Sequence, residues 1–202
     1  MSQSTRQTIA LLRLDMKMRC DYENKKLTWL RALRFCFLHA TLSSIIYRLQ
    51  VFFFYHYLKP LASLLSFINI IFFAVKIDSS AKIGPGFVML HANFITIGAN
   101  VIIGKNCILG HQNTICASPF YCEENLEADD VKTYLLEDIN ANKAPIIGDH
   151  LMMGGGSVIF GNITLGTHVK VSMNSAVDKS FPDHAVLLGV PARNVAKQSD
   201  QK

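Results

Sequence analysis

From residue 77 onward, an aliphatic residue returns every sixth position over most of the chain. The repeat changes register near residue 91 and again after residue 115, and glycine often follows the aliphatic residue, as at Gly84 and Gly166. The thirteen repeating positions are Ile77, Ile83, Met89, Ile97, Ile103, Leu109, Ile115, Ile147, Met153, Ile159, Leu165, Val171 and Val177. One inward residue in six, with small residues at the corners, predicts a mainly β solenoid whose stacked coils lie about 4.8 Å apart. A sheet sandwich would have to match this spacing by chance.

The period slips by two residues around His91. Met89 and Ile97 are eight residues apart, whereas Leu109 and Ile115 are six apart. Two extra residues predict a local bulge, and bulges re-aim side chains and are frequent beside active sites. We therefore expect His91 to lie at an irregular corner of the solenoid.

The slip also aligns two histidines. His91 and His111 each follow an inward residue by two positions, and they are twenty residues apart. Twenty is one coil of 18 residues plus the two extra residues, so we expect both histidines in one column on adjacent coils. Continuing the count through the later coils adds Gly155 and then Met173 to the column.

The N-terminal third has a different pattern. Residues 1–34 mix charged and apolar residues with few helix breakers, which predicts a helix. Residues 35–75 are strongly apolar, but their longest uncharged piece, 60–75, is short for a span of about 20 residues. We expect helices that pack together, pack on the next domain or lie in a membrane interface. A hairpin of two membrane spans remains the alternative. The predicted domains are 1–75 (apolar helical region), 76–180 (solenoid) and 181–202 (cap and tail).

Positive charge is concentrated in the same region. Residues 1–60 hold ten Lys and Arg against three acids, a net of +7, whereas residues 61–202 hold ten against twelve, a net of −2. A basic and apolar segment favours peripheral contact with an anionic membrane over binding of nucleic acid. The alternative is a helical cap with a solvated basic face.

One long segment interrupts the repeat. Residues 116–144 carry seven acids against two lysines, and we expect a loop extruded from one corner of the solenoid. Loops of this length in compact domains are usually functional or disordered.

Cysteine usage and the start of the chain indicate the compartment. The five cysteines are odd in number and form no CxxC pair, which predicts reduced thiols and no structural metal. The opening MSQSTRQTIALLRLD is polar and has no secretory pattern. We expect a cytoplasmic protein.

Three stretches carry a family resemblance: KIGPGFVMLHAN, APIIGDHLMMGGGSVIFGNITLG and FPDHAVLLGVPARNV. They resemble the hexapeptide-repeat acyltransferases, in particular the serine acetyltransferases and their relatives that O-acetylate capsular and other surface polysaccharides. The resemblance covers residues 75–196, and a GVPAR ending after a hexapeptide array is a fairly specific part of it. It implies a left-handed parallel β-helix, a homotrimer and acetyl-CoA bound between neighbouring subunits, with no metal.

The resemblance also implies roles for residues. His91 matches the general base, and a neutral imidazole near physiological pH suits that task. The family places the thiol arm of CoA beside the positions of Gly155 and Met173. A backbone N–H can stabilise the oxyanion, so no cysteine nucleophile is needed.

Further candidates surround this centre. We expect His111 to assist the base, and Asp78 either to orient His91 or only to cap a turn. Lys170 and Arg193 are candidates for the CoA phosphates, as point charge and fork respectively.

Three features depart from the serine-specific pattern. Lys76 stands where serine acetyltransferases carry the carboxylate partner of the base, and Leu90 replaces the aspartate before it. Lys143 and Ala144 replace the Arg-His pair that reads serine. These departures favour another hydroxyl acceptor. The loop offers Tyr121, Tyr134 and Lys143 as candidate contacts for a glycan.

The function that the sequence favours is acetyl-CoA-dependent O-acetylation of a sugar hydroxyl in a capsular or other surface polysaccharide, made at the inner face of the cytoplasmic membrane. Serine O-acetyltransferase is the alternative, and a non-enzymatic β-helix scaffold is a third class. A β-helical carbonic anhydrase would need a zinc triad of histidines, and no third histidine has the expected spacing.

Overall fold

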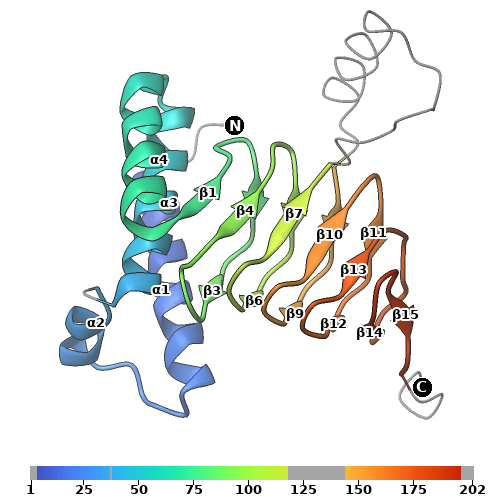
Figure 1. Ribbon diagram of the computed structural model, residues 1–202. Coiled ribbons are helices and arrows are strands. Elements are labelled where there is room, and N and C mark those ends of the chain that lie inside the picture. Colours follow the sequence, from blue (N-terminus) through green and yellow to red (C-terminus); the bar gives the residue numbers. More distant parts are fainter. Residues whose placement is uncertain (1–3, 37, 118–143, 197–202) are drawn as a thin grey trace, which may run out of the picture.

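A computed structural model describes residues 4–36, 38–117 and 144–196. Helices gather at one end of the molecule, and a stack of β-coils runs away from them (Figure 1). The chain changes from helix to strand between Phe73 and Val75. The predicted extruded loop falls almost entirely outside the described residues.

Four helices form the N-terminal region, where the sequence predicts one helix over residues 1–34. That prediction is wrong in part, because the first helix stops and a second begins before residue 34. Asn24 has a left-handed φ of 53°, and the Lys25 N–H returns to the Cys20 carbonyl oxygen at 2.8 Å, which closes the helix end. The helices are α1 (Thr5–Tyr22), α2 (Trp29–Cys36), α3 (His39–Tyr55) and α4 (Lys59–Phe73).

The strands form three sheets that wrap around one core. The sheet orders are β1-β4-β7-β10-β13, β2-β5-β8-β11 and β3-β6-β9-β12-β14-β15. All pairings are parallel except β14 with β15, which closes the last coil in the antiparallel sense. The strands are β1 (Val75–Ile77), β2 (Lys82–Ile83), β3 (Val88–Met89), β4 (Ile95–Ile97), β5 (Ile102–Ile103), β6 (Ile108–Leu109), β7 (Thr114–Cys116), β8 (Ile146–Ile147), β9 (Met152–Met153), β10 (Val158–Phe160), β11 (Thr164–Leu165), β12 (Lys170–Val171), β13 (Ala176–Val177), β14 (Val186–Leu188) and β15 (Arg193–Asn194).

The residues that repeat every six positions form the core of the β-helix. All thirteen repeating residues are buried, and each pairs with or stacks on its counterpart in the next coil, as Met89 does with Leu109 and Ile97 with Ile115. The predicted parallel β-helix of hexapeptide repeats after an N-terminal helical region is confirmed.

The open edge of the first coil is covered by helices α1 and α3. In the first coil, N–H groups such as that of Lys82 bond to the second coil, which leaves first-coil carbonyls without ladder partners. Side-chain donors of the two helices bond to five of these carbonyls. The bonds run from Arg19 to Met89 (3.0 Å), from Tyr47 to Ala81 (3.1 Å), from Arg48 to Ile83 and Gly84 (both 2.7 Å) and from Gln50 to Ile77 (2.9 Å). Satisfying these acceptors removes an exposed sheet edge.

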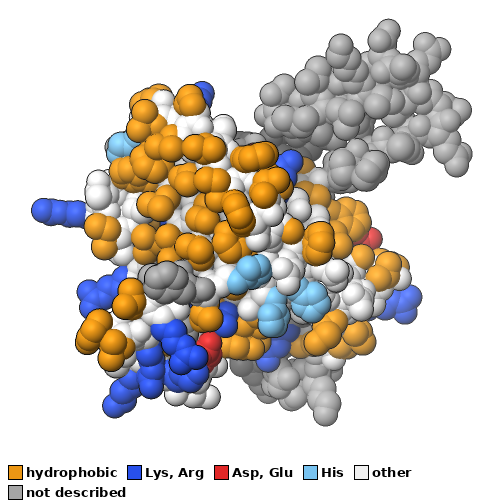
Figure 2. All heavy atoms as spheres, turned by 60° about the vertical axis from the view of Figure 1, so that its left-hand side comes forward, with side chains coloured by type: hydrophobic (Ala, Val, Ile, Leu, Met, Phe, Trp, Pro, Cys, Tyr) orange, Lys and Arg blue, Asp and Glu red, His pale blue; other side chains and the backbone are white. Residues whose placement is uncertain are grey.

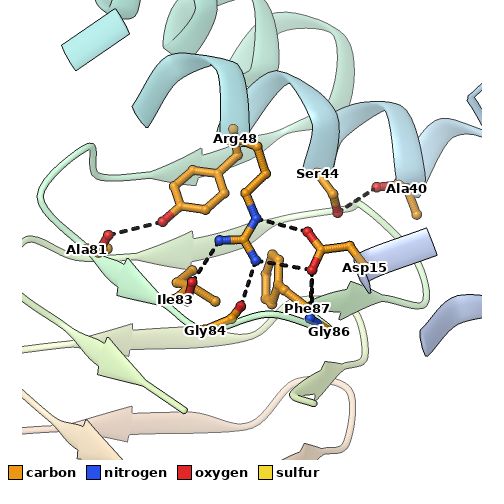
Figure 3. Close-up of polar contacts among 10 residues, drawn as sticks. Asp15, Ala40, Ser44, Arg48, Ala81, Ile83, Gly84, Gly86 and Phe87 are labelled. Carbon is orange, nitrogen blue, oxygen red and sulfur yellow. Dashed lines mark hydrogen bonds and ion pairs between the residues drawn. The ribbon is translucent and has the colours of Figure 1, made fainter. Parts of the chain in front are cut away.

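A buried ion pair joins α1 to this arrangement (Figure 3). The Arg48 guanidinium donates to both carboxylate oxygens of Asp15, at 2.9 and 3.1 Å. The N–H groups of Gly86 and Phe87 also donate to Asp15, each at 2.8 Å. Burial raises the pKa of the Asp15 carboxyl, and Arg48 and the two N–H groups offset this only in part. The pair therefore fixes geometry more than it adds net stability.

The helices do not support the transmembrane alternative. Within the described residues, no helix has both the length and the apolar character that crossing a membrane requires.

Candidate active site

An open pocket of about 640 Å³ lies along the face formed by β3, β6, β9, β12 and β14. Its walls are mostly apolar side chains and glycine backbone, with two histidines and one lysine. The lining residues are Leu90, His91, Ile108, Gly110, His111, Met152, Met153, Gly154, Gly155, Lys170, Val171, Ser172, Met173 and Val186. The four residues of the predicted column, His91, His111, Gly155 and Met173, all line this one pocket.

The two histidine rings face each other edge to face. The ring centroids of His91 and His111 are 6.0 Å apart and the planes make an angle of 71°. Both residues are exposed. Both rings line the pocket, and neither is hydrogen-bonded to another described residue.

Backbone hydrogen bonds locate the bulge. Leu90 donates to the second coil, and Asn93 accepts the next bond from it. One coil further on, the matching donor and acceptor are the adjacent residues Gly110 and His111. The two extra residues of the first coil are therefore His91 and Ala92. Ala92 turns into the core with no exposed surface, while His91 turns out into the pocket. In this hydrogen-bond ladder, Asn93 occupies the corner position in the first coil that His111 occupies in the second. The bulge brings the ring of His91 beside that of His111.

Gly155 makes room for His111. A Cβ atom on Gly155 would come within 2.6 Å of the His111 Cε1 and 2.9 Å of its Nδ1. Any side chain here would displace the imidazole. The Gly155 N–H makes no hydrogen bond to another described residue, so it is free to act as a donor.

Sequence reasoning missed Asn113 and Ser157, which support the glycine segment from below. Both are fully buried, and both donate to the Gly154 carbonyl oxygen at 2.6 Å. Asn113 also donates to the Ser157 hydroxyl at 3.1 Å. The available signal was an amide side chain two positions after His111.

Sequence reasoning also missed Arg19. Its guanidinium bonds to the Met89 carbonyl oxygen, two residues before His91, and to Glu23 at 3.0 Å. Helix α1 therefore fixes the end of β3, the strand that directly precedes the bulge. No local pattern links residues that are 70 positions apart.

Of the other predicted site residues, some line the pocket and some do not. Lys170 on β12 is exposed and lines the pocket. Arg193 on β15 is exposed but does not line the pocket. The Asp78 carboxylate accepts hydrogen bonds from the N–H and hydroxyl of Ser80, at 2.8 and 2.6 Å. The structure thus gives Asp78 the turn-capping arrangement and brings it into no hydrogen bond with His91.

The predicted substrate contacts Tyr121, Tyr134 and Lys143 lie outside the described residues. Of the departures from the serine-specific pattern, Leu90 lines the pocket next to His91. Lys76 is exposed on β1, and Ala144 is buried.

Three of the cysteines are poor nucleophiles. Burial raises the pKa of the thiols of Cys20, Cys107 and Cys116, which disfavours their thiolate forms. None of these three thiols lines the pocket.

Comparison with known proteins identifies sequence relatives over part of their length. No protein-family profile matches the chain. The chain is 32% identical over 125 residues to a serine acetyltransferase of Buchnera aphidicola subsp. Schizaphis graminum, covering 62% of this chain and 41% of that protein. It is 30% identical over 130 residues to mitochondrial serine acetyltransferase 3 of Arabidopsis thaliana, covering 64% of this chain and 29% of that protein. The chain thus spans less than half the length of these relatives.

Solved structures resemble almost the whole chain. A truncated serine acetyltransferase apoenzyme superposes with a TM-score of 0.76 at 25% identity, covering 96% of this chain and 72% of that one, and its CoA complex gives the same values. Neisseria gonorrhoeae serine acetyltransferase gives a TM-score of 0.76 at 23% identity, covering 96% and 68%. The chain therefore has the fold of the hexapeptide-repeat β-helix acyltransferases, and its aligned part is similar in sequence to serine acetyltransferases.

Proposed function

We propose that this chain is an acetyl-CoA-dependent O-acetyltransferase in which His91 is the general base. The observation that carries the proposal is the meeting of His91, His111 and Gly155 at one pocket. The relatives and structural neighbours above, one of them solved with CoA, add support.

The pocket suits the arm of CoA. Met152, Val171 and Met173 offer an apolar wall, and Gly154 and Gly155 line the pocket with backbone alone. Lys170 supplies a cation for a phosphate group. Arg193, which is exposed on β15 and does not line the pocket, remains a candidate for the same role.

The reaction needs one proton acceptor and one oxyanion donor. Acetyl-CoA supplies an activated acetyl thioester. His91 accepts the proton of the acceptor hydroxyl as its oxygen bonds to the carbonyl carbon, and we assign the free N–H of Gly155 to the developing oxyanion. Collapse breaks the carbon–sulfur bond, and the sulfur leaves with the electron pair and takes up the proton from His91. The products are the acetyl ester and free CoA.

Serine is the acceptor that the comparisons favour. The relatives and neighbours reported above are all named serine acetyltransferases, so this acceptor ranks above the sugar hydroxyl that sequence reasoning prefers.

A sugar hydroxyl remains the second candidate because of one observation. Leu90 lines the pocket next to His91, where a zwitterionic amino acid would need a polar partner. An unpaired charge buried against an apolar side chain is costly. No comparison supports a capsular substrate.

A thiol-release assay with acetyl-CoA separates these acceptors. We expect His91-dependent release of CoA with either serine or a glycan from a panel of simple sugars and capsular oligosaccharides. An efficiency of about 10⁴ M⁻¹s⁻¹ or more on serine, with none on any glycan, would establish the serine acceptor. The reverse result would establish the sugar. If no acceptor in the panel leads to release of CoA, although CoA binds, the result would favour the non-enzymatic scaffold.

A further inference from the structure

Helix α4 presents several large apolar side chains to solvent. Its two buried residues are the small Ala62 and the polar Asn69, and Asn69 exchanges hydrogen bonds with Ser43 on α3 at 2.7 and 3.3 Å. Its outer face carries side chains that are between 37% and 71% exposed: Leu61, Leu64, Phe67, Ile70, Ile71 and Phe72. Contiguous exposed apolar patches of this kind mark interaction sites on soluble folds.

A second apolar element belongs to the same region. Trp29, Leu30 and Leu33 on the short helix α2 are 74%, 59% and 54% exposed. They alternate with the exposed residues Arg31 and Arg34. A helix with tryptophan and leucine on one face and arginine beside them is typical of the membrane interface.

Positive charge lies beside these apolar residues. Residues 4–75 hold ten Lys and Arg and three acids, a net of +7. Two of the acids are already paired, Asp15 with Arg48 and Glu23 with Arg19 and Lys25. Figure 2 shows the apolar patch and the Lys and Arg side chains next to each other on one face of the molecule.

We propose that the outer face of α4, together with α2 and the basic side chains of α1 and α2, is a peripheral docking surface for a membrane rich in anionic lipid. The positive charge of this region indicates which partner binds the surface. A second copy docking through the same face would bring two regions of +7 together, and nucleic acid offers no apolar surface to cover Phe67 and Phe72. An anionic bilayer surface satisfies both the charge and the apolar side chains.

Docking by this face would hold the pocket close to the membrane. Helices α1 and α3 both contact β3, the strand that precedes His91. The proposal goes beyond acetyl transfer and does not depend on it.

Flotation of the full chain with vesicles tests the proposal. We expect binding to vesicles of phosphatidylcholine mixed with phosphatidylglycerol, weak binding to phosphatidylcholine alone, and loss of binding as salt is raised. Arg31→Gln with Arg34→Gln should weaken binding by about 30-fold, from about 1 kcal/mol per charge. Phe67→Ser with Phe72→Ser should remove it. All four side chains are exposed, so circular dichroism should show unchanged folding.

Matched controls lie on the β-helix, outside the proposed docking surface. Leu188→Ser with Val190→Ser removes two exposed apolar side chains, and Lys82→Gln with Lys179→Gln removes two exposed charges. Neither pair should alter flotation. Equal binding to neutral and anionic vesicles would overturn the anionic requirement, and no flotation would overturn the surface. Self-association that the Phe variants abolish, without vesicle binding, would assign the surface to a second copy and reject the proposal.

Discussion

His91 owes its position to two residues that break the repeat. The bulge turns Ala92 into the core and His91 into the pocket, beside His111. His91→Ala should therefore lower the acetyl-transfer rate by about 10²–10⁴-fold, the usual contribution of a general base, with CoA affinity nearly unchanged. The thiol-release assay gives the rate, and calorimetry gives the affinity.

His111→Ala is the matched control, since the two rings share the pocket and both are exposed. Its cost should be smaller. A mild His91→Ala with an inactive His111→Ala would mean that the base lies one coil further along.

At the scale of elements, α3 closes the β-helix through Arg48, which bonds to two first-coil carbonyls and to Asp15. Arg48→Met should reduce the free energy of unfolding by about 3–5 kcal/mol, because it leaves the Asp15 carboxylate buried and unpaired. Equilibrium urea denaturation measures this loss.

The exposed Arg34 provides a control, and Arg34→Met should change stability little. Adding Asp15→Leu to Arg48→Met should recover part of the loss, since no unpaired charge then remains. A single Arg48→Met variant as stable as the native chain would show that the pair is not needed to close the coil.

For the whole molecule we predict a homotrimer, because the resemblance implies that acetyl-CoA binds between neighbouring subunits. The pocket of a single chain is open, which is consistent with a wall supplied by a second subunit. Mass photometry of detergent-free protein should give three times the mass of a 22.5 kDa chain. A stable and active monomer would rule out a shared site.

The sequence by itself determined the β-helix and the centre of the pocket. The reason is that a period of six specifies which residue points inward in every coil, so register follows from counting. The same counting brought His91, His111, Gly155 and Met173 together, because the slip adds two residues to one coil only. The local sequence also indicated that Asp78 could cap a turn, since Ser80 is two residues away.

Only the tertiary structure decided how the helices meet the coils. The bonds from Arg19 to Met89 and from Arg48 to Gly84 join residues far apart in the chain, and no periodicity encodes them. The same holds for Arg193, a candidate for the CoA phosphates that does not line the pocket. The outward apolar face of α4 was likewise hidden, because composition shows that a helix is apolar but not which side its neighbour covers. That choice depends on the buried Ser43–Asn69 contact, which forms only when α3 and α4 pack.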